Sequence, residues 1–164
     1  SSDRPQSKIL LVAITSNRGL CGGFNANIIK KINLLVEEDY KESEVSILSI
    51  GKKSSEYFNN NNFSVVSTHD DVFSDLTYNS IASIASGIME DYINQKFDKV
   101  VLVYNQFKNA ATQNVMNEAY LPVESIDENE SSIGDYIFEP EKKEIIEELI
   151  PKSLKTQLLS LIHI

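Results

Sequence analysis

Residues 14–27, with the sequence ITSNRGLCGGFNAN, join a short apolar run to an amphipathic segment. The preceding residues 9–14 are continuously apolar, which is typical of a strand covered on both faces. Beyond the glycines, apolar side chains recur at helical spacing, at Ile28, Ile29, Ile32, Leu35 and Val36. Asn25 or Asn27 can cap the start of this helix. The order of strand, glycine-rich turn and helix usually indicates a phosphate-binding loop.

The glycines of this turn follow neither common phosphate-binding pattern. Gly19, Gly22 and Gly23 are spaced G-x-x-G-G, whereas the dinucleotide fingerprint is G-x-G-x-x-G. Phe24 departs from a P-loop, in which a Gly-Lys pair opens the helix. The second apolar run ends at Gly51 without a carboxylate to hold a ribose. We therefore expect glycines that allow a positive φ and close packing of the helix. A doubly wound nucleotide- or small-molecule-binding enzyme, with its ligand near residues 16–22, is the alternative.

The remaining reactive side chains form no convincing catalytic or metal-binding set. Cys21 could be a nucleophile at a helix N-terminus, but nothing in the sequence ties His69 or His163 to it as a base. His69 also begins the run HDD, residues 69–71, which could suggest metal ligands. Three adjacent residues rarely converge on one ion, so a solvated turn is the better interpretation. We expect no catalytic residue, no metal and no cofactor.

The composition is ordinary for a globular protein, with an acidic balance. Of the 164 residues, 41% are hydrophobic and 24% are charged, and the net charge is −9. An acidic chain disfavours nucleic acid as a partner, because binding its backbone requires clustered Lys and Arg. The single cysteine favours a reducing compartment. There is no signal peptide and no apolar run near the roughly 20 residues that span a bilayer, so we expect no direct membrane insertion.

Apolar runs and amphipathic segments alternate along the chain. Strands are predicted at residues 8–15, 45–50, 63–66, 99–104 and 115–123, with a polar bend at 109–113. Helices are predicted after residue 25, at 54–58, from Thr77, and from Glu141, where Pro151 predicts a kink. This alternation predicts an α/β sandwich with a mostly parallel sheet.

The stretch at residues 15–27 closely resembles the signature of the γ subunit of F-type ATP synthase. The matching positions include Arg18, Gly19, Leu20, Cys21, Gly22, Gly23 and Asn25. Three further segments resemble that family in the right order: YNQFKNA at 104–110, YIFEP at 136–140, and the helix at 149–158 that contains LIP and TQL. A weaker match lies at 75–78. The resemblance covers residues 8–159, nearly the whole chain.

The resemblance implies a central-stalk rotor subunit that couples proton flow through a membrane ring to rotary ATP synthesis or hydrolysis. Residues 1–140 would form a Rossmann-like α/β foot domain, and residues 141–164 the start of the long C-terminal shaft helix, with the shaft largely missing. The implied partners are the ATP synthase α and β subunits, the ε subunit and the c-ring. Such a subunit is non-catalytic and peripheral, here of bacterial type, at the cytoplasmic face of the inner (plasma) membrane.

The resemblance also implies where the ring is contacted. Tyr136, Phe138 and Glu139 match a family turn near the c-ring and the ε subunit, and aromatic residues are reasonable interface anchors. Covering the sheet edge is the alternative role for Tyr136 and Phe138. The sequence departs from the family at Lys152, Ser153 and Lys155, and again at residues 161–164, where we expect a truncated or non-native end.

Overall fold

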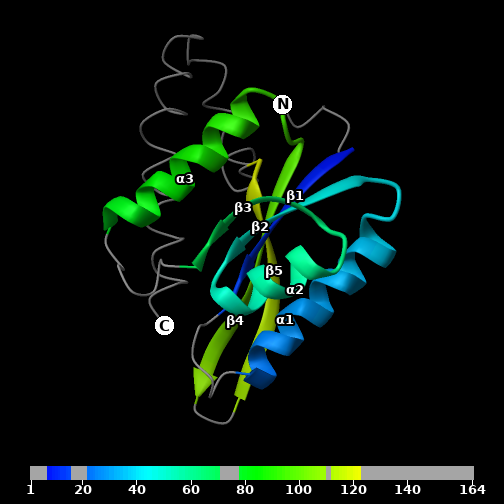
Figure 1. Ribbon diagram of the computed structural model, residues 1–164, viewed down its shortest axis with the longest axis vertical. Coiled ribbons are helices and arrows are strands. Elements are labelled where there is room, and N and C mark those ends of the chain that lie inside the picture. Colours follow the sequence, from blue (N-terminus) through cyan, green and yellow to red (C-terminus); the bar gives the residue numbers. More distant parts are fainter. Residues whose placement is uncertain (1–6, 16–21, 71–77, 110–111, 123–164) are drawn as a thin grey trace, which may run out of the picture.

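The computed structural model describes residues 7–15, 22–70, 78–109 and 112–122, and Figure 1 labels its elements. The strands are β1 (Lys8–Ile14), β2 (Glu44–Ile50), β3 (Ser64–His69), β4 (Lys99–Asn109) and β5 (Thr112–Leu121). The helices are α1 (Gly22–Leu34), which continues into the π-helical turn η2 (Leu35–Asp39), α2 (Lys52–Asn60) and α3 (Tyr78–Ile93). Strands and helices therefore alternate as far as β4, as the hydrophobic pattern predicts.

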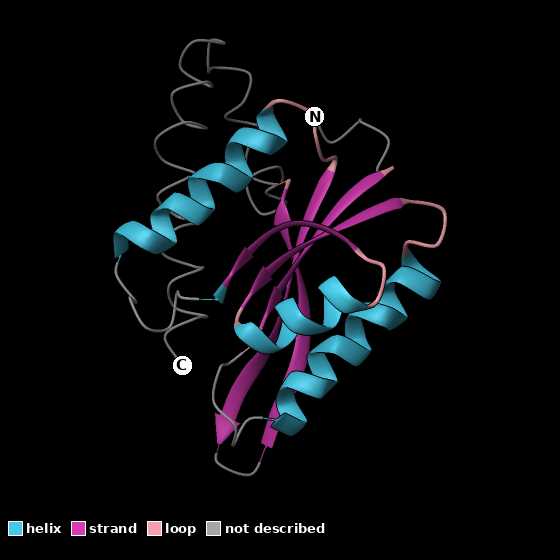
Figure 2. Cartoon of the chain, in the orientation of Figure 1, coloured by secondary structure: helices cyan, strands magenta, loops and turns pink. Residues whose placement is uncertain are grey.

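One five-stranded sheet organises the described residues, with the strand order β3-β2-β1-β4-β5. The first four strands of this order are parallel, and only β5 runs antiparallel to its neighbour β4. The predicted α/β fold with a mostly parallel sheet is confirmed. Figure 2 shows α3 crossing one face of the sheet, while α1 and α2 lie against the other.

The core has two halves, one on each face of the sheet, and the central strand β1 contributes side chains to both. Leu10, Val12 and Ile14 face the α3 side, and Ile9, Leu11 and Ala13 face the side of α1 and α2. All six are buried, which explains the uninterrupted apolar run in the sequence. Burying one large aliphatic side chain contributes about 2 kcal/mol. Within the described ranges, no helix is long and apolar enough to cross a bilayer.

The first helix begins earlier than the sequence suggests. Gly22 and Gly23 are the first two residues of α1, so they have helical backbone rather than the expected positive φ. Asn25 and Asn27 consequently lie inside the helix, and the prediction that either one caps it is wrong. The Asn25 side chain is instead buried in the first turn. The helix therefore starts here in spite of the low helix propensity of the two glycines.

The polar bend predicted at residues 109–113 is in fact the tip of a long hairpin. The strand β4 continues to Asn109, and β5 starts at Thr112, with Asn109 opposite Thr112 in the register. This hairpin extends beyond the other strands at the lower end of the molecule in Figure 1. Backbone pairing with β5 keeps polar residues of β4 extended where their β propensity is low. The strand β5 ends just before Pro122, which cannot donate to the sheet.

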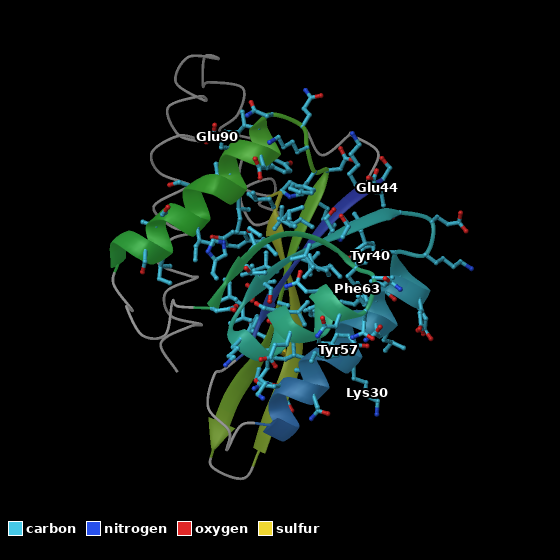
Figure 3. The ribbon with its side chains drawn as sticks, in the orientation of Figure 1. Lys30, Tyr40, Glu44, Tyr57, Phe63 and Glu90 are labelled. Carbon is cyan, nitrogen blue, oxygen red and sulfur yellow. The ribbon has the colours of Figure 1, made fainter. Side chains whose placement is uncertain are left out.

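An aromatic group fastens α2 to the sheet and to α1. The rings of Phe58 and Phe63 are 4.9 Å apart in an edge-on contact, and those of Tyr57 and Phe63 are 6.2 Å apart. Figure 3 shows Tyr57 of α2 and Phe63, which lies just before β3, above α1. The Asn33 amide of α1 donates a hydrogen bond to the Tyr57 hydroxyl at 3.1 Å. These contacts make α1 and α2 one layer.

The pairing of β2 with β3 is irregular at one point. Ile47 lies opposite Val65, but the next residue, Leu48, lies opposite Ser67. Val66 is therefore an extra residue in β3, and its side chain is 46% exposed. Extra residues of this kind bend a strand and increase its twist.

Candidate functional site

The carboxyl ends of the parallel strands are where an open α/β sheet would bind a ligand. At this edge, β1 ends beside Thr15 and β2 ends at Ile50 and Gly51. Arg18, Gly19, Leu20 and Cys21, the first part of the signature turn, lie outside the described residues. Gly22, Gly23 and Asn25 are described, and all three belong to the first turn of α1. Tyr136, Phe138 and Glu139, the predicted ring contact, also lie outside the described residues.

Four buried hydroxyl groups lie together at the ends of β1 and β2, and we call Thr15, Ser49, Ser54 and Ser55 the hydroxyl cluster. Each of them is at most 3% exposed. Thr15 Oγ1 donates to Ser54 Oγ at 3.0 Å, and Ser49 Oγ is hydrogen-bonded to both Ser54 Oγ and Ser55 Oγ. The Ser55 hydroxyl also donates to the Asp70 carboxylate, just beyond β3. The cluster therefore links β1, β2, α2 and the end of β3.

The hydroxyl cluster also occupies the start of α2. The backbone N–H of Ser54 donates to Thr15 Oγ1 at 3.2 Å, and the Ser54 and Ser55 hydroxyls lie 3.2 and 3.0 Å from the Gly51 carbonyl oxygen. The N–H groups at the start of a helix are those that would bind a phosphate. Because Thr15 accepts from one of them, this helix end is capped from a different strand.

Gly51 brings the backbones of β1 and α2 into direct contact. Its φ is +105°, and a Cβ atom built there would lie 2.1 Å from the Thr15 carbonyl oxygen. Only glycine fits both constraints. Among the described residues, the glycine with a positive φ is therefore Gly51. The sequence predicts only that a strand ends there.

The run at residues 69–71 does not form a metal site in the described residues. His69 is the last residue of β3, and its Nε2 lies 3.2 Å from Ser67 Oγ. Burial lowers the pKa of His69, and the nearby Asp70 carboxylate partly offsets this. The predicted solvated turn is thus wrong for His69, which is half-buried in a strand. Across the described ranges, no three metal-ligating side chains gather.

A second polar contact lies on the hairpin. Tyr104 of β4 donates its hydroxyl to the Glu118 carboxylate of β5 at 2.6 Å. Burial, with the hydrogen bond and negative charge of Glu118, raises the pKa of Tyr104 to about 12. Burial alone raises the pKa of Tyr120. Both phenols are therefore neutral at physiological pH, and their arrangement suits packing of the hairpin rather than proton transfer.

Sequence reasoning missed the hydroxyl cluster, although a local signal was present. Two serines, Ser54 and Ser55, lie in the first turn of the helix that follows Gly51, and hydroxyl residues near a helix start are common capping groups. Their partner Thr15 belongs to another strand, which local patterns do not reveal. Chemically, hydroxyls bonded to one another and to backbone carbonyls fasten elements together. In the described residues, they join the ends of β1 and β2 to the start of α2.

The fold and this edge define a class: an α/β domain of Rossmann-like strand order in which buried hydroxyl groups join the described ends of β1 and β2 to α2. A family model described as ATP synthase matches residues 1–163, and the chain therefore belongs to that family.

Curated relatives support the resemblance to the γ chain. The ATP synthase gamma chain of Flavobacterium johnsoniae is 47% identical over 159 residues, covering 96% of this chain and 55% of the relative. The ATP synthase gamma chain of Christiangramia forsetii is 44% identical over 158 residues, with the same two coverages. The chain thus spans about half the length of the curated relatives it matches. The predicted resemblance is confirmed.

Solved structures confirm the fold. The central stalk/c-ring structure of Tetrahymena thermophila mitochondrial ATP synthase contains a chain that matches with a TM-score of 0.70 at 23% identity, covering 99% of this chain and 72% of that one. The rotor of Euglena gracilis mitochondrial ATP synthase matches with a TM-score of 0.64 at 18% identity, covering 95% and 60%. At these identities the likeness concerns the fold.

Proposed function

We propose that this chain is the foot of the central-stalk rotor of an F-type ATP synthase, which couples proton flow through the membrane ring to ATP synthesis or hydrolysis. The observation that supports this most strongly is the 44–47% identity to ATP synthase gamma chains over 96% of the chain. The described residues agree with a non-catalytic role, because the hydroxyls at the ends of β1 and β2 are buried and bonded to one another.

The architecture suits a part that transmits torque. A sheet covered on both faces by helices is close-packed, and close-packed interiors resist deformation. The hydroxyl cluster and the aromatic contacts of Tyr57 fasten α2 to the neighbouring elements. A rotor needs such stiffness and a surface for its partners, and it needs neither a cofactor nor a metal.

The proposal includes a division of the chain and a set of partners. Residues 1–140 form the Rossmann-like foot domain, and residues 141–164 form the start of the C-terminal shaft helix. The partners are the α and β subunits, the ε subunit and the c-ring, and the protein is peripheral at the cytoplasmic face of the bacterial membrane. The signature residues 18–25 shape the corner between β1 and α1, while Tyr136, Phe138 and Glu139 contact the ring or the ε subunit.

A replacement experiment tests the rotor role. The matching segment of the Flavobacterium johnsoniae ATP synthase gamma chain is exchanged for this sequence, and proton-driven ATP synthesis is measured in inverted membrane vesicles. We expect synthesis well above that of vesicles whose γ chain lacks the segment. An assembled enzyme that hydrolyses ATP without any proton-driven synthesis would contradict the proposal.

The ring contact is tested in the same exchanged enzyme with Phe138→Ala. We expect a several-fold loss of proton-driven synthesis while hydrolysis persists, because truncating an aromatic anchor weakens an interface. Val66→Ala, which shortens an exposed apolar side chain on β3, is the matched control and is expected to leave synthesis unchanged. Equal synthesis by the two variants would remove Phe138 from the interface.

A further inference from the structure

A buried carboxylate holds the start of the central strand, and neither the hydroxyl cluster nor the proposed ring contact uses it. Asp98 lies immediately before β4 and is 9% exposed. Its Oδ2 atom accepts three hydrogen bonds: from the Lys8 backbone N–H at 2.9 Å, from the Ser7 backbone N–H at 3.2 Å, and from the Ser7 hydroxyl at 3.2 Å. Hydrogen bonds to an ionised acceptor are about twice as strong as neutral ones.

The same two residues are bonded through their carbonyl groups as well. The Asp98 backbone N–H donates to the Lys8 carbonyl at 2.7 Å, and the Glu44 backbone N–H donates to the Ser7 carbonyl at 2.7 Å. Figure 3 labels Glu44 at the start of β2. All four backbone polar groups of Ser7 and Lys8 are therefore hydrogen-bonded, either to Glu44, the first residue of β2, or to Asp98, just before β4. We call this arrangement the β1 anchor.

The β1 anchor lies where the chain first enters the sheet. The strand β1 is central, with β2 on one side and β4 on the other. A load that enters at Ser7 would therefore pass through the anchor into three adjacent strands at once. Without Asp98, three donors of Ser7 and Lys8 would lose their acceptor, and the first residues of β1 would be held chiefly through the Ser7 and Lys8 carbonyls.

We propose that Asp98 is a positioning residue that fixes Ser7 and Lys8 at the start of β1 and passes load that enters at Ser7 into the sheet. The load itself is rotational torque, so this part of the inference rests on the proposed rotor function. The anchoring part does not, because it follows from the hydrogen bonds alone.

Three variants of the complete protein separate anchoring from general stability. Asp98→Ala removes the acceptor, and Asp98→Asn keeps an acceptor oxygen but removes the charge. Asp91→Ala is the matched control, because Asp91 is an aspartate on α3 whose ion pair with Lys96, at 3.3 Å, is largely exposed. Amide hydrogen exchange reports the opening of individual hydrogen bonds. In Asp98→Ala we expect the Lys8 amide to exchange about tenfold faster or more, with Val12 unchanged.

The mechanical part is tested in the assembled enzyme, through the ratio of proton pumping to ATP hydrolysis and the angular fluctuation of a bead attached to the foot. Asp98→Ala is expected to lower the ratio and widen the fluctuation, Asp98→Asn to lie between, and Asp91→Ala to match the unsubstituted protein. An unchanged exchange rate of the Lys8 amide in Asp98→Ala would contradict the anchoring role of Asp98. Fast exchange with unchanged coupling and fluctuation overturns its role in load transfer. If the unsubstituted protein does not support proton pumping, that result contradicts the proposed rotor function and not the anchoring role of Asp98.

Discussion

Gly51 has neither the backbone conformation nor the space for a side chain. We expect Gly51→Ala to lower the free energy of unfolding by about 3 kcal/mol. The reasons are the φ of +105° and the 2.1 Å approach of the new Cβ to the Thr15 carbonyl oxygen. Urea denaturation followed by circular dichroism measures the change.

Gly87 provides the control at the same scale. It lies within α3, and a Cβ atom there would meet nothing within 4 Å. We expect Gly87→Ala to raise the free energy of unfolding by about 0.5–1 kcal/mol, because alanine is the better helix former. Similar losses in both variants would show that neither the φ nor the contact with Thr15 decides the effect at Gly51.

Among the elements, α2 depends most on a partner distant in sequence. We expect Thr15→Val to lower the free energy of unfolding by about 1–2 kcal/mol. Valine keeps the shape of threonine but cannot accept the hydrogen bond from the Ser54 N–H. Thr68→Val, on the exposed side of β3, is the comparison and is expected to change stability by less than about 0.5 kcal/mol. Thermal melts of the Thr15→Val and Thr68→Val proteins measure the difference, and equal melting temperatures would refute the capping role of Thr15.

The elements also show which features local sequence determines. The buried strands β1, β2 and β4 could be predicted, because apolar runs between turns mark them. The start of α1 at Gly22 could not, since two glycines oppose a helix. The end of the hairpin at Asn109 and Thr112 could not be predicted either. Backbone pairing rather than side-chain preference extends those residues.

At the scale of the whole molecule, the hydroxyl cluster at the ends of β1 and β2 predicts that nucleotides do not bind there. In a thermal-shift measurement with millimolar ATP, ADP or NAD, we expect no ligand-dependent rise in melting temperature, because a ligand stabilises only a protein that binds it in the folded state. The buried cluster at Thr15, Ser49, Ser54 and Ser55 is the reason. A rise that grows with nucleotide concentration would favour the enzyme alternative over the rotor.

The candidate site shows the limit of sequence reasoning at this scale. The mismatch of Gly19, Gly22 and Gly23 with phosphate-binding patterns was visible from spacing alone. The hydroxyl cluster and the β1 anchor were not, because each joins residues from strands that meet only in the folded sheet. Asp98 looks like an ordinary polar residue before a strand until Ser7 and Lys8 are placed beside it.

The extra residue Val66 in β3 affects how the molecule behaves toward its own copies. A regular terminal strand offers a row of N–H and C=O groups to which a second sheet can add, a common origin of aggregation. The strand β3 is last in the order of the sheet, and it is short and interrupted where Leu48 pairs with Ser67. The added bend and twist make this edge a poor template for fibre growth.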